Sequence, residues 1–125
     1  MKTLFVYFIC CIALNACSKG TAEKDTEFPV ITLNTPLDNQ VFTDGQSIPM
    51  SGSITDNKSI AEIHIHVTNS NTGTLLMDVH LYPNGATAVF NQSITATTGV
   101  NYKIEIIAID RAVNKTTSVV NVSCN

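Results

Sequence analysis

Three histidines in the middle of the chain have a spacing that suits a metal ion. His64 and His66 form a His-x-His triplet, and His80 follows the segment "TNSNTG", whose composition is typical of a hairpin turn. If the flanking segments pair as a hairpin, His64, His66, Asp78 and His80 share one face, with cross-strand neighbours about 5 Å apart. Neutral imidazoles and a carboxylate are ligands of zinc-type ions. These four residues are therefore the candidate metal site.

A second interpretation of the same residues needs no metal. A polar outer face can carry histidines that pair with nearby carboxylates, here Glu62 and Asp78. A solvent-facing sheet offers no closed pocket, and the sequence reveals no partner that would orient the imidazoles. The sequence leaves the metal site and the polar face as alternatives.

Aspartate and asparagine recur in two predicted loops. Asp56 and Asn57 lie in one of them, and Asp110 and Asn114 lie in the other. In the fold expected below, both loops lie at the same end of the molecule, and calcium takes six to eight oxygen ligands of this kind. These four residues are a candidate calcium site. The alternative is that they stabilise the turns by bonding their own backbone.

Other features bear on the class of function. The chain has neither Gly-x-Ser-x-Gly nor His-Glu-x-x-His, and it has no glycine-rich phosphate loop, so we expect a non-enzymatic protein. The chain contains no Trp, and Tyr82 beside "PNG" is the aromatic residue best placed to stack on a sugar, which makes it a candidate binding residue. A net charge of −3 without a basic patch argues against a nucleic-acid partner.

The N-terminus has the pattern of an export signal. Lys2 precedes the apolar run Leu4–Leu14, which is shorter than the roughly 20 residues of a membrane-spanning helix. The run ends in "LNAC", which resembles the bacterial lipobox, although Asn15 is unusual at its position. The resemblance implies that residues 1–16 are a lipoprotein signal peptide and that Cys17 carries diacylglycerol and an N-acyl chain such as palmitate. The alternative is an ordinary signal peptide cut near the same point.

A tether and one domain follow the predicted cleavage point. Residues 17–27 are charged and small, and they indicate a lipidated N-terminus and flexible tether, so that the membrane is a partner through the lipid anchor. Residues 28–125 are long enough for one domain. After cleavage only Cys124 remains beside Cys17, which excludes a disulfide framework, and we expect Cys124 to fray at the chain end.

Apolar residues recur at every second position after the tether, in short runs separated by Asn, Asp, Gly and Pro. This pattern predicts strands, and no segment has the 3.6-residue period of a helix. Seven strands at this spacing favour an all-β fold, an immunoglobulin-like antiparallel β-sandwich, with a small barrel as the alternative. The predicted strands are Pro29–Asn34, Ser47–Thr55, Ile60–Thr68, Thr74–Tyr82, Thr87–Ile94, Asn101–Asp110 and Lys115–Ser123.

Two stretches resemble immunoglobulin-like and fibronectin-III-like domains of exported bacterial proteins. In "TTGVNYKIEIIAIDRAVN", Gly99 and Tyr102 have the spacing of a corner in which the tyrosine bonds backwards across the turn. Asp110 and Asn114 match the next turn of these domains, but Val113 stands where glycine is usual. The stretch "FPVITLNTPLDNQVFTDGQSIPMSGSITDNKSIAEIHIHV" resembles their front half.

Together with the lipobox, the chain resembles a small lipoprotein of the Bacteroidota type, a kind that includes domains of unknown function. The resemblance implies an outer-membrane lipoprotein of the bacterial cell envelope. We expect a non-enzymatic binding or structural module for a protein or glycan partner, with no cofactor beyond the lipid. The alternative is a metal-binding envelope protein that uses the histidines, with zinc, or calcium at the two loops, as its ion.

Overall fold

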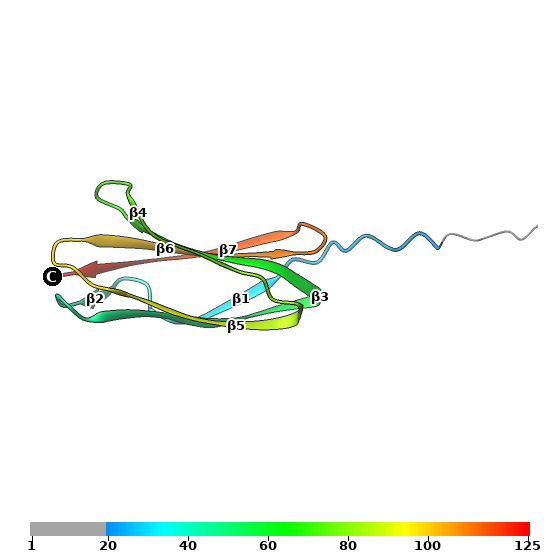
Figure 1. Cartoon of the computed structure of the whole chain (residues 1–125), viewed down its shortest axis with the longest axis horizontal. Helices are drawn as coiled ribbons and strands as arrows, with labels where there is room; N and C mark the ends of the chain where they lie inside the picture. The colour runs from blue at the N-terminus through cyan, green and yellow to red at the C-terminus, as the bar shows by residue number, and fades with distance from the viewer. Residues whose placement is uncertain (1–19) are drawn as a thin grey trace, which may run out of the picture.

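The computed structural model describes residues 20–125, so the predicted signal peptide and Cys17 lie outside the described residues. This part of the chain forms seven strands, and it contains no helix that could cross a membrane. An extended segment enters the domain at one end, and the C-terminus lies at the other (Figure 1). The strands are β1 (Val30–Thr35), β2 (Gln40–Phe42), β3 (Ser47–Asn69), β4 (Leu75–Leu81), β5 (Gly85–Thr95), β6 (Asn101–Asp110) and β7 (Lys115–Cys124).

The strands form two layers that share β3. In one layer β1 and β5 flank the first half of β3. In the other, β4 and β6 flank its second half, and β7 and β2 continue the sheet beyond β6. This is an immunoglobulin-like β-sandwich, as predicted, and each of these pairs except β2–β7 is antiparallel.

Strand β3 differs from the prediction, which placed a turn between two separate strands. The chain stays extended from Ser47 to Asn69 and passes from one layer to the other. Opposite β5, the pairing jumps from Thr55 to Ile60, so the segment "DNKS" forms a bulge. Such bulges let one strand turn a corner between sheets. Asp and Asn predicted a turn here because they are common in turns, but they also suit a bulge.

Strand β2 was missed because it has only three residues. It pairs in parallel with β7, where Phe42 lies opposite Cys124. Both side chains are buried, with exposures of 6% and 3%. The expectation that Cys124 frays is therefore wrong: β2 pairs with the last residues of β7, and Cys124 is buried.

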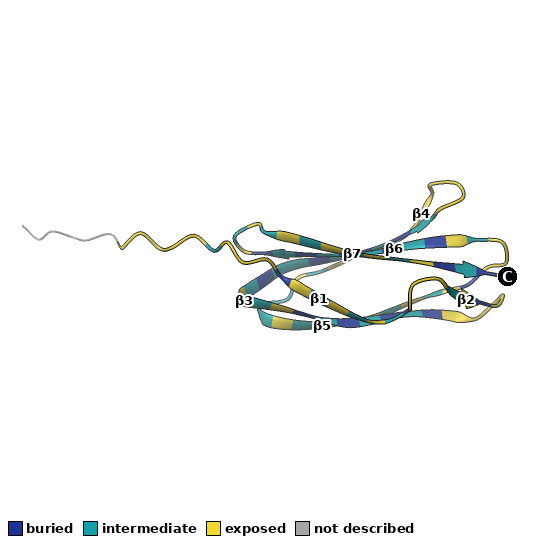
Figure 2. Cartoon of the chain, turned by 180° about the vertical axis from the view of Figure 1, so that it is seen from behind, coloured by how far each residue is buried: buried dark blue, intermediate teal, exposed yellow. Residues whose placement is uncertain are grey.

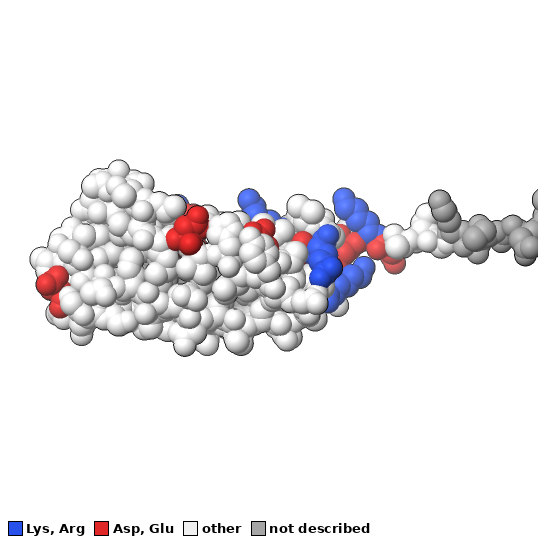
Figure 3. Space-filling view, in the orientation of Figure 1, with Lys and Arg blue, Asp and Glu red and all other residues white. Residues whose placement is uncertain are grey.

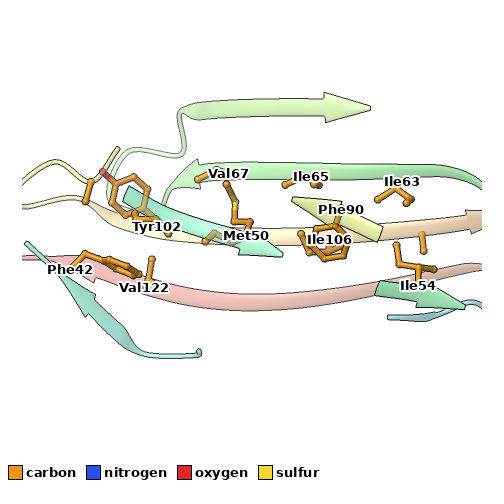
Figure 4. Packing of buried hydrophobic residues seen from close by; sticks show 14 of the residues in the cluster. Phe42, Met50, Ile54, Ile63, Ile65, Val67, Phe90, Tyr102, Ile106 and Val122 are labelled. Carbon is orange, nitrogen blue, oxygen red and sulfur yellow. The ribbon is translucent and has the colours of Figure 1, made fainter. Parts of the chain in front are cut away.

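The core lies between the layers and follows the predicted alternation along β3 and β6. Figure 2 shows buried and exposed residues alternating along the strands. Close packing of branched aliphatic side chains is what stabilises a domain without disulfides. The buried residues at alternate positions of these two strands, all at most 2% exposed, are Ile63, Ile65, Val67, Tyr102, Ile104, Ile106 and Ala108. Figure 4 labels Ile63, Ile65, Val67, Tyr102 and Ile106.

The tyrosine corner forms as predicted. The backbone N–H of Thr97 donates to the Tyr102 hydroxyl at 2.8 Å, which gives this buried phenol a partner. Gly99, inside the corner, has a φ of 80°, a conformation that glycine adopts without a steric penalty.

The turn between β6 and β7 contains Val113, at the position where the resembling domains usually have glycine. Val113 has a φ of 71° and is 78% exposed. A left-handed conformation costs a residue with a Cβ about 1–2 kcal/mol, and valine is branched at that atom. Val113 therefore holds a strained position at which glycine would not be strained.

We expect Val113→Gly to stabilise the domain. Relief of strain outweighs the greater backbone entropy that glycine gives the unfolded chain, for a net gain of about 0.5–1 kcal/mol. Thermal unfolding followed by circular dichroism measures the change. Val119→Gly, at an exposed position in strand β7, is the control and should lower stability. A lower midpoint for Val113→Gly would contradict the assignment of strain.

Candidate metal centre

The hairpin of β3 and β4 brings the three histidines together. His64 lies directly opposite His80, and His66 lies opposite Asp78. The rings of His64 and His80 have centroids 4.0 Å apart, and one ring nitrogen from each histidine lies within 4.8 Å of the others. Because His64 and His66 alternate with the buried Ile65, they stay on the outer face of the sheet. The predicted face-sharing of these residues is therefore confirmed.

Two carboxylates contact the imidazoles, and they are Glu62 and Asp78, the residues that the sequence offered as their partners. Glu62 Oε1 lies 2.7 Å from His64 Nε2 and 3.1 Å from His80 Nδ1. On the other side, Asp78 Oδ1 lies 2.9 Å from His80 Nε2 and 3.1 Å from His66 Nε2. Each carboxylate thus lies between two rings. These contacts are also the His–carboxylate pairs of the alternative without a metal.

The first carboxylate also contacts Tyr82. Partial burial disfavours the charge on Glu62, but hydrogen bonds from His64, His80 and Tyr82 outweigh it and lower the pKa of Glu62 below its ordinary value. Burial raises the pKa of the Tyr82 phenol, and the charge and hydrogen bond of Glu62 raise it further. Glu62 is therefore held as an acceptor, while Tyr82 stays protonated as a donor.

Tyr82 follows directly after β4 and lies at the edge of the histidine cluster. Its ring centroid is 6.5 Å from that of His80, and the residue is 71% exposed. Its ring remains accessible to a ligand, as the predicted sugar contact requires. Its hydroxyl is also a partner of Glu62, a role that sequence alone did not indicate.

The calcium candidates lie together at the end where the extended segment enters. Carboxylate oxygens of Asp56, Asp110 and Asp25 lie within 4.8 Å of one another. Asp110 is buried and accepts hydrogen bonds from the backbone N–H and side-chain amide of Asn114, at 2.8 and 2.7 Å. Asn57 donates to Asp25 at 3.0 Å. The predicted grouping is present, and calcium binding there stays a prediction.

Asp25 was missed because nothing in its local sequence predicts this position. It comes from the charged segment before β1, which has no apolar periodicity. The side-chain amide of Asn114 donates to the carbonyl oxygens of Asp25 and Glu27, at 3.2 and 2.9 Å, and thereby joins that segment to the turn between β6 and β7. The hydrogen bond from Asn57 also lowers the pKa of Asp25. The end of the predicted tether is therefore fixed to the domain.

A polar hollow lies at the opposite end, and the sequence gave no sign of it. We call it the distal hollow; it has a volume of about 340 Å³. Amide and hydroxyl side chains supply most of its polar groups, which can both donate and accept hydrogen bonds. Its lining residues are Asn39, Ser70, Asn101, Tyr102, Asn121, Val122 and Ser123.

The two-layered topology and the tyrosine corner define an immunoglobulin-like module. Residues 29–106 match the model of the bacterial Ig domain family. The chain therefore belongs to the bacterial Ig domain family, as one domain of a class that is typically structural or binding. No curated protein matches the sequence.

Solved structures agree with this fold. The chain is similar to a fibronectin(III)-like module of CbhA from Clostridium thermocellum, at 21% identity and a TM-score of 0.54, over 76% of this chain and 94% of that one. It is also similar to OgpA from Akkermansia muciniphila, at 7% identity and a TM-score of 0.53, over 79% and 29% of the two chains. A superoxide reductase (neelaredoxin) from Ignicoccus hospitalis gives 11% identity and 0.51, over 79% and 81%. Identities this low establish the fold alone.

Proposed function

We propose that this protein is a lipid-anchored, non-enzymatic binding or structural module of the bacterial envelope. Cys17 carries the lipid, and residues 17–27 form the tether. The protein is anchored in the outer membrane of a Bacteroidota-type bacterium. The observation that carries the proposal is the placement of the chain ends. The extended segment leaves one pole of the sandwich, and the C-terminus lies at the opposite pole (Figure 1). A membrane anchor on that segment would leave the far pole free.

Charged side chains are concentrated at the end of the domain that the extended segment enters. On the face shown in Figure 3, Lys and Arg side chains gather near the entering segment, with acidic groups among them, and most of the remaining surface is uncharged. Lys24 and Lys58 are two basic residues of this end, and Asp25, Asp56 and Asp110 are acidic residues of the same end. The charges near the entering segment are therefore mixed, and the less charged surface lies away from the proposed anchor.

Hydrogen bonds between loops make the far pole a firm surface. Gly45 N–H donates to Ala96 O at 2.9 Å, and Ser70 N–H donates to Asn101 O at 2.8 Å. Gly99 N–H donates to Cys124 O, also at 2.9 Å. Loops fixed in this way lose little entropy when a partner binds. The distal hollow lies among them, and its amide and hydroxyl groups suit a hydroxyl-rich glycan or a polar protein surface.

We expect Cys17→Ser in the full chain to release the protein from the membrane. One acyl chain holds a protein only marginally, whereas several hold it stably, and the variant has no thiol to receive them. Cell fractionation, with intact-mass measurement of the purified protein, reads out the anchor. Cys124→Ser is the matched control, since its thiol is buried, and it should stay in the membrane fraction. A Cys17→Ser protein that stays membrane-bound, or wild type without added acyl mass, would refute the anchor.

The proposed binding of a partner at the distal hollow is tested with the same wild-type protein in detergent. Printed glycans and envelope polysaccharides are the probes, and Asn101→Ala removes one amide from the distal hollow. Reduced binding by Asn101→Ala would support the hollow as the contact surface. Equal binding by both proteins, or no binding by wild type, would remove the hollow from the proposal.

A further inference from the structure

We propose that the outer face of β3 and β4 binds one divalent zinc-type ion through His64, His66, His80 and Asp78. The inference goes beyond the anchored module and does not depend on the lipid. It rests on three observations: the separations of the donor atoms, the two carboxylates that face the ring of His80, and the buried nitrogen of His64 beside Glu62.

The separations of the donor atoms suit a single ion. Zinc binds imidazole nitrogen at about 2.0–2.1 Å in a tetrahedral site, so that neighbouring ligand atoms lie about 3.3 Å apart. Asp78 Oδ1 lies 2.9 Å from His80 Nε2 and 3.1 Å from His66 Nε2, close to that separation. His64 supplies the remaining nitrogen from within 4.8 Å. Small rotations of these partly exposed side chains would bring all four ligands onto one ion.

Both ring nitrogens of His80 face carboxylates. Its Nδ1 faces Glu62 and its Nε2 faces Asp78, at 3.1 and 2.9 Å. A carboxylate only accepts and a neutral imidazole has one N–H, so a neutral ring can donate to one of these two carboxylates and not to both. An ion bound at Nε2 removes the mismatch, because it binds the lone pair of His80 and the Asp78 oxygen together. Nδ1–H then still donates to Glu62.

That arrangement is the usual support of a metal-bound histidine. The second ring nitrogen of such a ligand typically donates to a carboxylate, which fixes the tautomer and the ring orientation. Glu62 has this relation to His80, and the hydrogen bond from Tyr82 restrains Glu62 in turn. Glu62 is therefore a positioning residue and Asp78 is a ligand. The carboxylate of Glu105, which lies opposite His66 on β6, is engaged by Lys103 at 2.9 Å.

His64 brings a buried nitrogen to the site. Its Nε2 lies 2.7 Å from Glu62 Oε1, an oxygen that it shares with His80 Nδ1. An ion bound at this nitrogen would leave Glu62 to His80 alone. The side chain of Asp78 is 45% exposed, so an ion could enter and leave from solvent.

Titration of the full chain with zinc chloride, in detergent and without a histidine tag, tests the proposal by calorimetry. We expect one ion per chain at micromolar affinity or tighter, and a loss of at least tenfold in His66→Ala and Asp78→Asn. Glu62→Gln should weaken binding about tenfold while the stoichiometry stays at one. Thr117→Ala, at an exposed position of strand β7 in the same sheet, is the matched control and should bind as wild type does.

Several outcomes would overturn the proposal. No zinc binding by wild type would leave only the His–carboxylate pairs. Equal affinity in wild type and His66→Ala, measured on protein with unchanged circular dichroism, would place any bound zinc elsewhere, and loss of that binding in Asp25→Asn would locate it at the acidic end. None of these results bears on membrane fractionation of Cys17→Ser, so failure of the metal site and failure of the anchor are distinguishable.

Discussion

Gly52→Ala should destabilise the domain by about 3 kcal/mol or prevent folding. Gly52 lies in the first half of β3, between Leu33 of β1 and Phe90 of β5. A Cβ at this position would overlap the carbonyl oxygen of Thr32 and would lie 2.7 Å from Phe90 Cζ. The carbonyl cannot move aside, because β1 is paired with β3 on both sides of it. The added methyl group therefore has no low-energy position.

Urea unfolding followed by circular dichroism measures this effect. Gly85→Ala is the matched control, because the nearest atom to its added Cβ is 4.0 Å away, and it should change stability little. Adding Phe90→Leu to Gly52→Ala should restore only part of the loss, since the smaller side chain leaves the Thr32 carbonyl in place. If Gly52→Ala unfolded at the wild-type midpoint, the close packing of β1, β3 and β5 around Gly52 would be wrong.

The fold could be predicted largely because alternation is a local property. A residue such as Ile65 faces the core because of its place in the sequence 60–68, and the structure buries it completely. The path of β3 could not be predicted in this way. Whether "TDNKS" turns back or bulges depends on where β5 and β6 pair with its two sides, and these contacts are distant in sequence. The pairing of β2 with β7 is likewise set by contacts 80 or so residues apart.

The same difference between local and distant contacts explains which candidate-site residues could be predicted. His64 and His80 lie on one hairpin, so that turn composition and alternation were enough to place them together. The role of Glu62 depends on side-chain rotamers, because its carboxylate reaches both His64 and His80. Asp25 joins Asp110 only through the course of an extended segment without periodicity. Sequence patterns therefore predict residues brought together by one hairpin better than residues brought together by the whole fold.

Ile106→Ala is expected to cost about 3–4 kcal/mol in the free energy of unfolding. Ile106 is completely buried in β6, lies opposite Ile65 of β3, and shares one hydrophobic cluster with Phe90 from the other layer (Figure 4). Deleting its side chain removes transfer free energy and leaves a cavity between two sheets whose hydrogen bonds keep them from collapsing. Urea denaturation measures the change, with an unchanged dependence on urea concentration as the sign of an intact two-state transition.

Ile107→Ala is the matched control, because the neighbouring residue on the same strand points to the outer face and is only partly buried. It should cost about 1 kcal/mol, in proportion to the smaller apolar area that it removes from water. Equal costs at the two positions would contradict the assignment of the core to one face of β6. Because His64 lies opposite Ile107 on that outer face, an Ile106→Ala protein that still folds should keep its affinity for zinc. The inner face of this sheet thus stabilises the domain, and the outer face carries the proposed zinc site.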